Sequence, residues 1–296
     1  MKPQIVGDAV AVRFFMPSPA LAPYISTYYL TEVSVPDGAV IEDFLHPEWA
    51  NIRFAHNHSW QAAVGSDPLR KAPQVISAGP TSHTSHFVTG SARIWGVGIL
   101  PMGWARFFDA PASDYADRFC DGATDPVFAG IAPLLGATFA DTPDAAAEAR
   151  RIDDYLLNLL AARPAHPDEA RIREAHAALI DHDIAAVADL AERLATSPRS
   201  LERLSLRAFG FSPKLLLRRQ RFLRSLAQFM LDPSLKWINT LDWQYVDQAH
   251  FVRDFKRFMG MSPTAYAALD HPVLRAAARA RAAAAGEAVQ ALHRPA

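Results

Sequence analysis

The pattern of hydrophobic positions changes character along the chain. In the first 105 residues, short runs of β-branched and aromatic residues alternate with Pro, Gly and Asn, a pattern typical of strands joined by turns. Such runs predict six strands, at Ala9–Phe15, Tyr24–Val35, Ala50–His56, Trp60–Val64, Gln74–Ile76 and Arg93–Leu100. Many short strands on one chain favour a sandwich or a barrel, because closure removes exposed sheet edges.

From about Pro143 the hydrophobic residues follow the 3.6-residue period of a helix. In Ala145–Leu160 they share one face. Two prolines in Ala161–Pro167 break the helical pattern and predict a linker. The segment from Asp168 to about Leu269 predicts a series of short helices. The Ala/Arg-rich stretch Val273–Leu292 predicts a surface helix with a frayed end.

These patterns divide the chain into parts of different fold. We expect an α+β multidomain protein, in which a mainly β domain with a terminal helix (1–164) precedes an all-α domain (165–270) and a tail (271–296). Charge follows the same division. Residues 1–164 carry 11 Lys/Arg against 17 Asp/Glu, and residues 165–296 carry 19 against 14. The second half is therefore the part suited to a polyanion, although uneven charge alone also arises by chance.

Composition also bears on the compartment. Cys120 is the single cysteine, so the chain has no intrachain disulfide and no zinc site built from several thiolates. The first residues lack the basic and apolar runs of a signal peptide, and no window approaches 18 consecutive apolar residues. We therefore expect a cytoplasmic protein without a membrane partner.

The most informative feature is an internal repeat at a spacing of 50 residues. Ser197–Pro213 reads SPRSLERLSLRAFGFSP, and Asp247–Pro263 reads DQAHFVRDFKRFMGMSP. The matched pairs are Arg203 and Arg253, Arg207 and Arg257, Gly210 and Gly260, and the two Ser-Pro steps at 212–213 and 262–263. Each copy has a capping residue, an amphipathic helix, a glycine where a left-handed C-cap belongs, and a Ser-Pro start of the next helix.

Each copy also follows a shorter predicted helix, Ile184–Leu194 in the first case and Leu235–Trp243 in the second. A helix, a short turn and a capped helix make a helix-turn-helix unit, whose second helix can lie in the major groove of DNA. The helical stretch Lys214–Met230 separates the two units by about 25 Å, which suits successive major grooves.

Arginines are concentrated in the first copy and in the linker helix. Residues 197–224 contain eight Lys/Arg and one acidic residue, Glu202. Arg199, Arg203 and Arg207 recur every fourth residue and so form one stripe, which can pair with phosphates or guanine edges. A solvated helix face whose arginine stems cover the core is the alternative interpretation.

Residues 171–269 resemble the DNA-binding domain of AraC/XylS-type transcription regulators. The resemblance lies in SPRSLERL, in the following FGFSP, and in DQAHFVRDFKRFMGMSPTAY at 247–266. It implies a sequence-specific regulator that binds double-stranded DNA with two recognition helices. The implied DNA-contacting residues are Pro198, Arg199, Ser200, Glu202, Arg203 and Arg207 in the first helix, and Gln248, Ala249, His250 and Arg253 in the second.

The second unit departs from the family pattern at two positions. Gln244 stands where a glycine is usual, and a left-handed conformation there would cost Gln about 1 kcal/mol. Thr240 stands where a small alanine is usual. We therefore expect the second unit to dock more loosely than the first, and Arg203 to contribute more to base recognition than Gln248.

The first half of the chain says less about chemistry. Gly98–Asp121 resembles an uncharacterised domain often fused to AraC-type regulators, and related sensor domains are cupin-like β-barrels. This resemblance implies a sensory or dimerisation domain, with a small-molecule effector, a homodimer and, for an activator, RNA polymerase as partners. Trp49, Trp60 and Trp95, together with Trp104, are candidates for lining an effector pocket or for filling the core.

The alternative function is an enzyme fused to a DNA-binding module, as in DNA-repair proteins. It needs a reactive cysteine or a metal cluster in residues 1–164. We expect Cys120, near a predicted helix end, to be a packed apolar residue. His46, His83 and His86 are the available ligands, but in a strand His83 and His86 face opposite sides. We predict no catalytic residues, no metal and no cofactor. A protein whose helix-turn-helix units have lost DNA affinity is a third interpretation.

Overall fold

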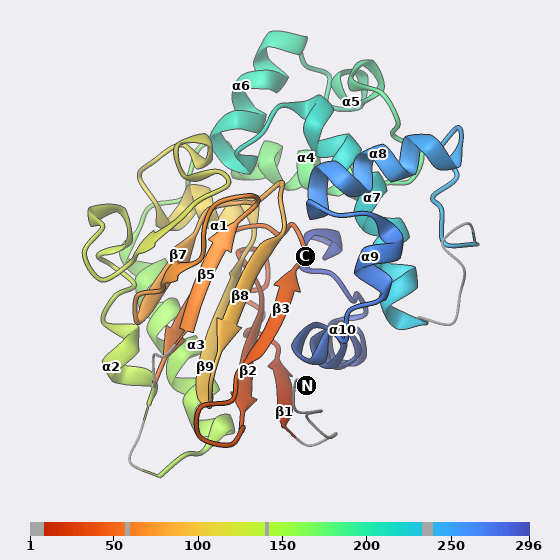
Figure 1. The fold of residues 1–296 in the computed structure, drawn as a ribbon. Helices are drawn as coiled ribbons and strands as arrows, with labels where there is room; N and C mark the ends of the chain where they lie inside the picture. Colours follow the sequence, from red (N-terminus) through yellow and green to blue (C-terminus); the bar gives the residue numbers. More distant parts are fainter. Residues whose placement is uncertain (1–8, 57–59, 140–141, 233–238) are drawn as a thin grey trace.

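The computed structural model describes residues 9–56, 60–139, 142–232 and 239–296 (Figure 1). The N-terminal part contains two antiparallel sheets. One sheet has the strand order β1-β2-β9-β4-β7-β10 and the other has the order β3-β8-β5-β6. The strands are β1 (Val10–Phe15), β2 (Ile25–Val33), β3 (Ile41–Leu45), β4 (Asn51–Ala55), β5 (Trp60–Val64), β6 (Arg70–Lys71), β7 (Val75–Ala78), β8 (Ser85–Thr89), β9 (Ala92–Ile99) and β10 (Phe119–Asp121).

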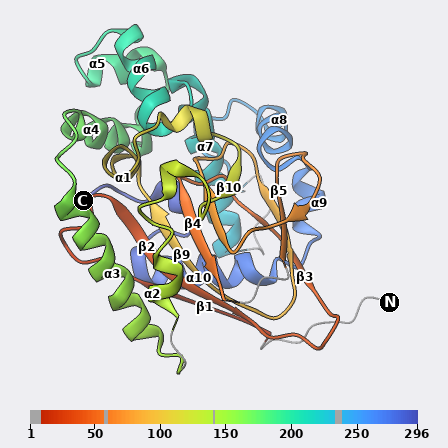
Figure 2. The same ribbon diagram turned by 90° about the vertical axis from the view of Figure 1, so that its left-hand side faces the viewer.

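The six-stranded sheet carries hydrophobic side chains on both faces. On β2, Tyr28 and Leu30 pack with helix α3 (Ala145–Ala162), whereas Thr27, Tyr29 and Thr31 point to the opposite side. The alternation follows from the two-residue period of a strand. Apolar residues of both sheets, among them Trp60 and Ile94, form a core between the sheets. The result is a β-sandwich with α3 on the outer face of its larger sheet (Figure 2).

The fold class predicted from the sequence is confirmed, with a β-rich N-terminal part followed by helices. All six predicted strands are present within two residues of their expected ends. Strands β3 and β8 were not predicted, because polar residues interrupt both IEDFL and SHFVT. Their pairing brings His86 Nε2 to 2.9 Å from Glu42 Oε1 across the two strands. Cys120 lies in strand β10 rather than at the predicted helix end.

Short helices α1 (Pro101–Phe107), η1 (Ala112–Tyr115), η2 (Pro126–Phe128) and α2 (Leu134–Thr138) connect the sandwich to α3. Residues 163–167 then lead into the helical part. Its helices are α4 (Glu169–Ile180), α5 (Val187–Arg193), α6 (Pro198–Phe209), α7 (Pro213–Leu231), α8 (Gln248–Met259) and α9 (Pro263–Ala267). They enclose a core of aliphatic and aromatic residues that includes Leu201, Phe222 and Phe251.

The first helix of the second predicted unit differs from expectation. Part of the predicted helix Leu235–Trp243 lies outside the described residues. The described remainder of that helix, 239–243, is irregular with one 3-10 position instead of helix, and 244–247 continue as turn and bend up to α8. Thr240 and Asp242 are buried there, and Ser225 Oγ on α7 accepts a hydrogen bond from the Asp242 amide. The second unit therefore contacts α7 through an irregular segment.

The C-terminal segment is also different from expectation. The predicted surface helix is α10 (Pro272–Ala285), and it packs on β1 and β3 at the opening between the two sheets (Figure 1). Val273 is part of the core between the sheets. Leu274 and Ala278, together with Ala291 and Leu292 of the 3-10 turn η4 (Gln290–Leu292), belong to the core of the helical part, because α10 and η4 also contact α7. Residues 272–292, which follow the repeated helices in sequence, therefore pack against both the sandwich and the helical part.

Candidate DNA-binding surface and ligand cavity

Helix α6 has the ends that the repeat predicts. Ser197 Oγ accepts a hydrogen bond from the Ser200 amide, Pro198 occupies the first turn, and Gly210 ends the helix at a φ of 81°. A left-handed C-cap at this φ favours glycine. Leu201, Leu204, Ala208 and Phe209 are buried, whereas Pro198, Arg199, Glu202, Arg203 and Arg207 are exposed and Ser200 is half-buried. The face that the sequence predicts to read DNA is therefore on the surface.

Helix α8 repeats this design. Asp247 Oδ1 accepts a hydrogen bond of 2.6 Å from the His250 amide, and Gly260 ends the helix at a φ of 70°. Phe251, Phe255, Phe258 and Met259 are buried on the inner face. Gln248, Ala249 and Arg253 are exposed on the outer face. His250 is half-buried, lies edge-on to Tyr245, and has Nε2 3.0 Å from Arg221 Nη2. His250 is therefore held within the domain on one side.

Most of the arginines in the linker helix α7 are occupied inside the protein. Arg218 and Arg221 both pair with the buried carboxylate of Asp254, at 2.5 and 3.0 Å, and Arg224 pairs with Asp242. The expectation of a basic surface running from α6 through α7 is corrected accordingly. Sequence periodicity places a residue on a helix face, but it does not tell which face meets a buried carboxylate.

Arg219 lies in the interface between the helical part and the sandwich. Its side chain is fully buried, and Nη1 donates to Thr81 O at 2.8 Å and to Glu48 O at 3.3 Å. The guanidinium lies 4.0 Å from the centre of the Trp49 ring, a cation–π contact. Burial lowers the pKa of Arg219 to about 9. Arg219 thus connects the two parts of the molecule and is not available to a phosphate in this conformation.

Gln244 does not adopt the conformation that would strain it. Among the described residues other than glycine, positive φ values occur at Asp117, Ala195 and His271. Gln244 instead uses its side chain, since Nε2 donates to His182 O at 2.6 Å and Oε1 accepts from Arg224 at 3.2 Å. The condition for the expected cost, a left-handed conformation of Gln244, is therefore not met, and the turn of the second unit is tied to the loop between α4 and α5.

The recognition face of α6 points across a cleft toward the N-terminal part. Arg199, Glu202, Arg203 and Arg207 line a cleft of about 740 Å³. The other wall includes Trp104 and Phe108 of the α1 region, Asp109 to Pro111, and Ser113 of η1. At the end of α6, a Cβ on Gly210 would lie 2.5 Å from Pro80 Cγ, so the helix meets the sandwich directly at its C-cap. Arg199, Arg203 and Arg207 are therefore exposed to solvent in the cleft, and residues 104–113 form its opposite wall.

A second cavity, of about 130 Å³, lies inside the sandwich. Its walls come from β2 and β4 of the larger sheet, from the loop 45–48, from Trp60 and Phe87 of the smaller sheet, and from residues 273–290. Trp60 lines this cavity. Trp95 is buried on the other face of the larger sheet and donates from Nε1 to Glu148, and Trp49 packs against Arg219 and Phe209. The three tryptophans proposed for one pocket are therefore in three places.

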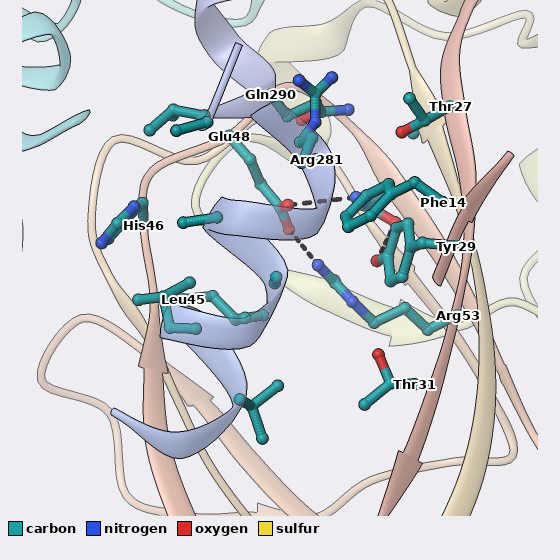
Figure 3. A pocket seen from close by; sticks show the side chains of 18 of the residues that line it. Phe14, Thr27, Tyr29, Thr31, Leu45, His46, Glu48, Arg53, Arg281 and Gln290 are labelled. Atoms are coloured by element: carbon teal, nitrogen blue, oxygen red, sulfur yellow. Dashed lines mark hydrogen bonds and ion pairs between the residues drawn. The ribbon is translucent and has the colours of Figure 1, made fainter. Parts of the chain in front are cut away.

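Polar groups of the cavity form one network. Glu48 Oε1 accepts from Arg53 at 2.6 Å, and its other oxygen accepts from Asn51 at 3.1 Å. The Tyr29 hydroxyl donates to Asn51 Oδ1 at 2.8 Å. Figure 3 shows Glu48 and Arg53 pointing toward each other, with Arg281 and Gln290 close together nearby. Burial and the adjoining His271 lower the pKa of His46 to about 3, so His46 is neutral at physiological pH.

The remaining candidate residues are dispersed. His83 lies 3.4 Å from Asp117, His86 pairs with Glu42, and His46 lies 2.8 Å from the Tyr266 hydroxyl. Within the described parts of the chain, no three His, Cys, Asp or Glu side chains are placed to hold a metal ion. Burial raises the pKa of the Cys120 thiol to about 12, and Cys120 Sγ donates to Ser77 O at 3.6 Å. No described helix is long and apolar enough to cross a membrane.

Comparison with known proteins identifies the C-terminal domain. Residues 190–268 match the family model of a helix-turn-helix domain. This range contains both capped helices, α6 and α8, with α7 between them. The chain thus carries a helix-turn-helix domain at residues 190–268.

Among proteins of curated function, none matches the chain significantly. Solved structures give distant similarities. ToxT from Vibrio cholerae, bound to (E)-4-(8-methylnaphthalen-1-yl)but-3-enoic acid, has a TM-score of 0.44 and 10% identity, covering 88% of this chain and 98% of its own. Unsaturated fatty acid bound ToxT scores 0.41 at 13% identity, covering 79% and 97%. The AraC-like transcriptional activator CuxR scores 0.22 at 14% identity, covering 74% and 88%. Similarities at this level carry no conclusion about the ligand of this chain.

Proposed function

We propose that the chain regulates transcription by placing α6 and α8 in successive major grooves of double-stranded DNA, under the control of its N-terminal sandwich. The observation that carries this proposal is the pair of helices with the same caps, the same buried inner face and an exposed outer face. Helix α7 between them has 19 residues, a length of about 28 Å, which suits the spacing of successive grooves. DNA as the target places the proposed regulator in the cytoplasm.

The proposed base-reading residues are those on the outer faces. Arg199, Glu202 and Arg203 on α6 lie on one face, where Arg203 can bind a guanine edge with two hydrogen bonds. Pro198, Ser200 and Arg207 flank them. On α8, Gln248, Ala249 and Arg253 are exposed, and His250 would have to give up its contact with Arg221 to reach a base.

The cleft beside α6 suggests how control is exerted. The recognition face of α6 lines the cleft opposite α1 and η1, so this face lies close to the sandwich. We propose that binding of DNA through α6 involves a movement of the helical part relative to the sandwich. The contacts that resist the movement include Arg219 with Thr81 and the Arg106–Glu169 ion pair at 2.9 Å. We propose that a small-molecule effector in the sandwich shifts this equilibrium, since a ligand favours the state it binds better.

Full-length protein tests the proposal against duplexes selected from genomic DNA. We expect binding whose affinity falls steeply between 50 and 200 mM salt, because each neutralised phosphate adds about −0.9 to the slope of log K against log salt. A flat salt dependence, or no preference for selected over scrambled duplexes, contradicts the proposal.

A further inference from the structure

One wall of the sandwich cavity is formed by residues 273–290, which lie outside the N-terminal part of the chain. Val273, Leu274 and Ala278 of α10 and Val289 and Gln290 beyond it line the cavity. The N-terminus of α10 is held by strand β3, because Asp43 Oδ2 accepts hydrogen bonds from the amides of Val273 and Leu274, at 2.9 and 2.8 Å. The segment after the DNA-binding domain therefore closes the cavity of the domain before it.

This wall brings a buried cation to the cavity. Arg281 is 4% exposed, and Nη1 donates to Glu287 O at 2.8 Å. Nη2 of Arg281 has no hydrogen-bond partner among the described residues, and neither has Oε1 of the neighbouring Gln290 side chain. Arg219, the other buried arginine with free N–H groups, is stacked on Trp49, whereas Arg281 has no such ring among the described aromatic residues. Burial lowers the pKa of Arg281 to about 10, which still leaves it charged at neutral pH.

The charges of the lining do not balance. Arg53 and Arg281 are cations and Glu48 is the single acidic side chain of the lining, so two positive charges minus one negative charge leave +1. Glu48 is already engaged by Arg53 and Asn51. The rest of the lining is mostly apolar, with Phe14, Trp60 and Phe87 among its largest members. Glu287 and Glu48 also attract the Arg281 cation, but Nη2 of Arg281 still has no hydrogen-bond partner among the described residues. An unpaired buried donor is costly, and a bound anion would remove that cost.

Volume limits the size of the ligand. A cavity of about 150 Å³ accommodates a benzene molecule in another protein, and the cavity here is about 130 Å³. We propose that the cavity binds a small organic monoanion, with its carboxylate on Arg281 and its apolar body between the sheets, and that residues 272–290 form the closing wall of the site. This inference rests on the proposed function only in treating the bound molecule as an effector.

Benzoate is a suitable probe, because it combines a ring of the right size with one carboxylate. Benzamide is its neutral counterpart. Titration calorimetry and thermal unfolding of the full chain should show benzoate binding and a raised Tm, with benzamide at least tenfold weaker. Arg281→Gln should weaken benzoate binding at least tenfold, Arg281→Lys should retain part of it, and Arg279→Gln, at an exposed arginine of the same helix, should leave it unchanged.

Ala277→Leu provides a second test, because it fills the cavity without removing a charge. It should block benzoate binding even if Arg281→Gln fails to fold. Equal binding of benzamide and benzoate, wild-type binding in Arg281→Gln or Ala277→Leu, or no binding of benzoate, pivalate and isobutyrate would each overturn the inference. DNA binding is measured separately on the same protein. Its persistence in the absence of carboxylate binding refutes the ligand and leaves the proposed function standing.

Discussion

Replacing Asp43 by Ala should release α10 from the sandwich. The Asp43 carboxylate is fully buried, caps the first turn of α10 through two amides, and lies 2.9 Å from His271 Nδ1. Loss of a helix cap costs about 0.5–2 kcal/mol, and each buried donor left unpaired costs about 1–3 kcal/mol. When α10 undocks, water reaches the unpaired amides and reduces the added cost of the cap and the unpaired donors. We therefore expect a loss of about 2–4 kcal/mol in the free energy that holds α10 in place.

Hydrogen exchange measures this quantity directly. A loss of about 3 kcal/mol corresponds to exchange roughly 100-fold faster, confined to residues 272–292 and to the β1 and β3 edges beneath them. Asp37→Ala is the matched control, since Asp37 is an exposed aspartate in the loop that connects β2 to β3. If the α10 amides of Asp43→Ala exchange at the wild-type rate, the cap does not hold the helix and the account of the closing wall is wrong.

Three further predictions concern recognition, the interface and pH. Arg203→Ala should cost about 1–3 kcal/mol of specific DNA binding and weaken the base preference at one operator position, and Gln248→Ala should cost less. Competition titrations against operator and scrambled duplexes measure both losses. The reverse order would contradict the ranking of the two units. Arg219→Ala should lower the urea midpoint of the whole protein and leave the salt dependence of DNA binding unchanged, because the guanidinium contacts Thr81 and Trp49 and not phosphate. A smaller slope of log K against log salt in the variant would show that Arg219 does contact DNA. Burial lowers the pKa of both His46 and His176 to about 3, so the unfolded chain binds more protons than the folded one below about pH 6.5. Stability should therefore fall as pH decreases from 7 to 5.5, by about 1 kcal/mol for each histidine, and urea titrations in which His46→Asn shows the same pH dependence as wild type would refute the assignment.

Local sequence signals were sufficient where the structure depends on neighbouring residues. The caps at Ser197 and Asp247 and the left-handed glycines at 210 and 260 follow from residue type at a fixed spacing, and all four are present. The repeat could thus be assigned to two capped helices before any long-range contact was known.

Signals that depend on distant partners were not visible. Helix α10 has few large apolar residues, so its sequence resembles that of a solvated helix. Its burial became visible only from its distant partners, because Val273 joins the core between the sheets and Leu274 and Ala278 join the core of the helical part. Arg218, Arg219 and Arg224 look like a basic surface, yet their partners Asp254, Thr81 and Asp242 are 18 to 138 residues away in sequence. A buried arginine and a DNA-binding arginine have the same local pattern, and only the tertiary partner separates them.

The position of α10 also has a consequence for the order of events during synthesis. The last strand of the larger sheet that borders the cavity, β9, ends at Ile99, and Gln290, whose side chain donates to Ala50 O, is made 191 residues later. At about 5–20 residues per second, the nascent sandwich waits about 10–40 s with its apolar interior open on one side. During that interval the helix-turn-helix units are already leaving the ribosome. The newly made protein therefore passes through a stage in which α6 and α8 have been synthesised but the sandwich still lacks the wall formed by residues 273–290.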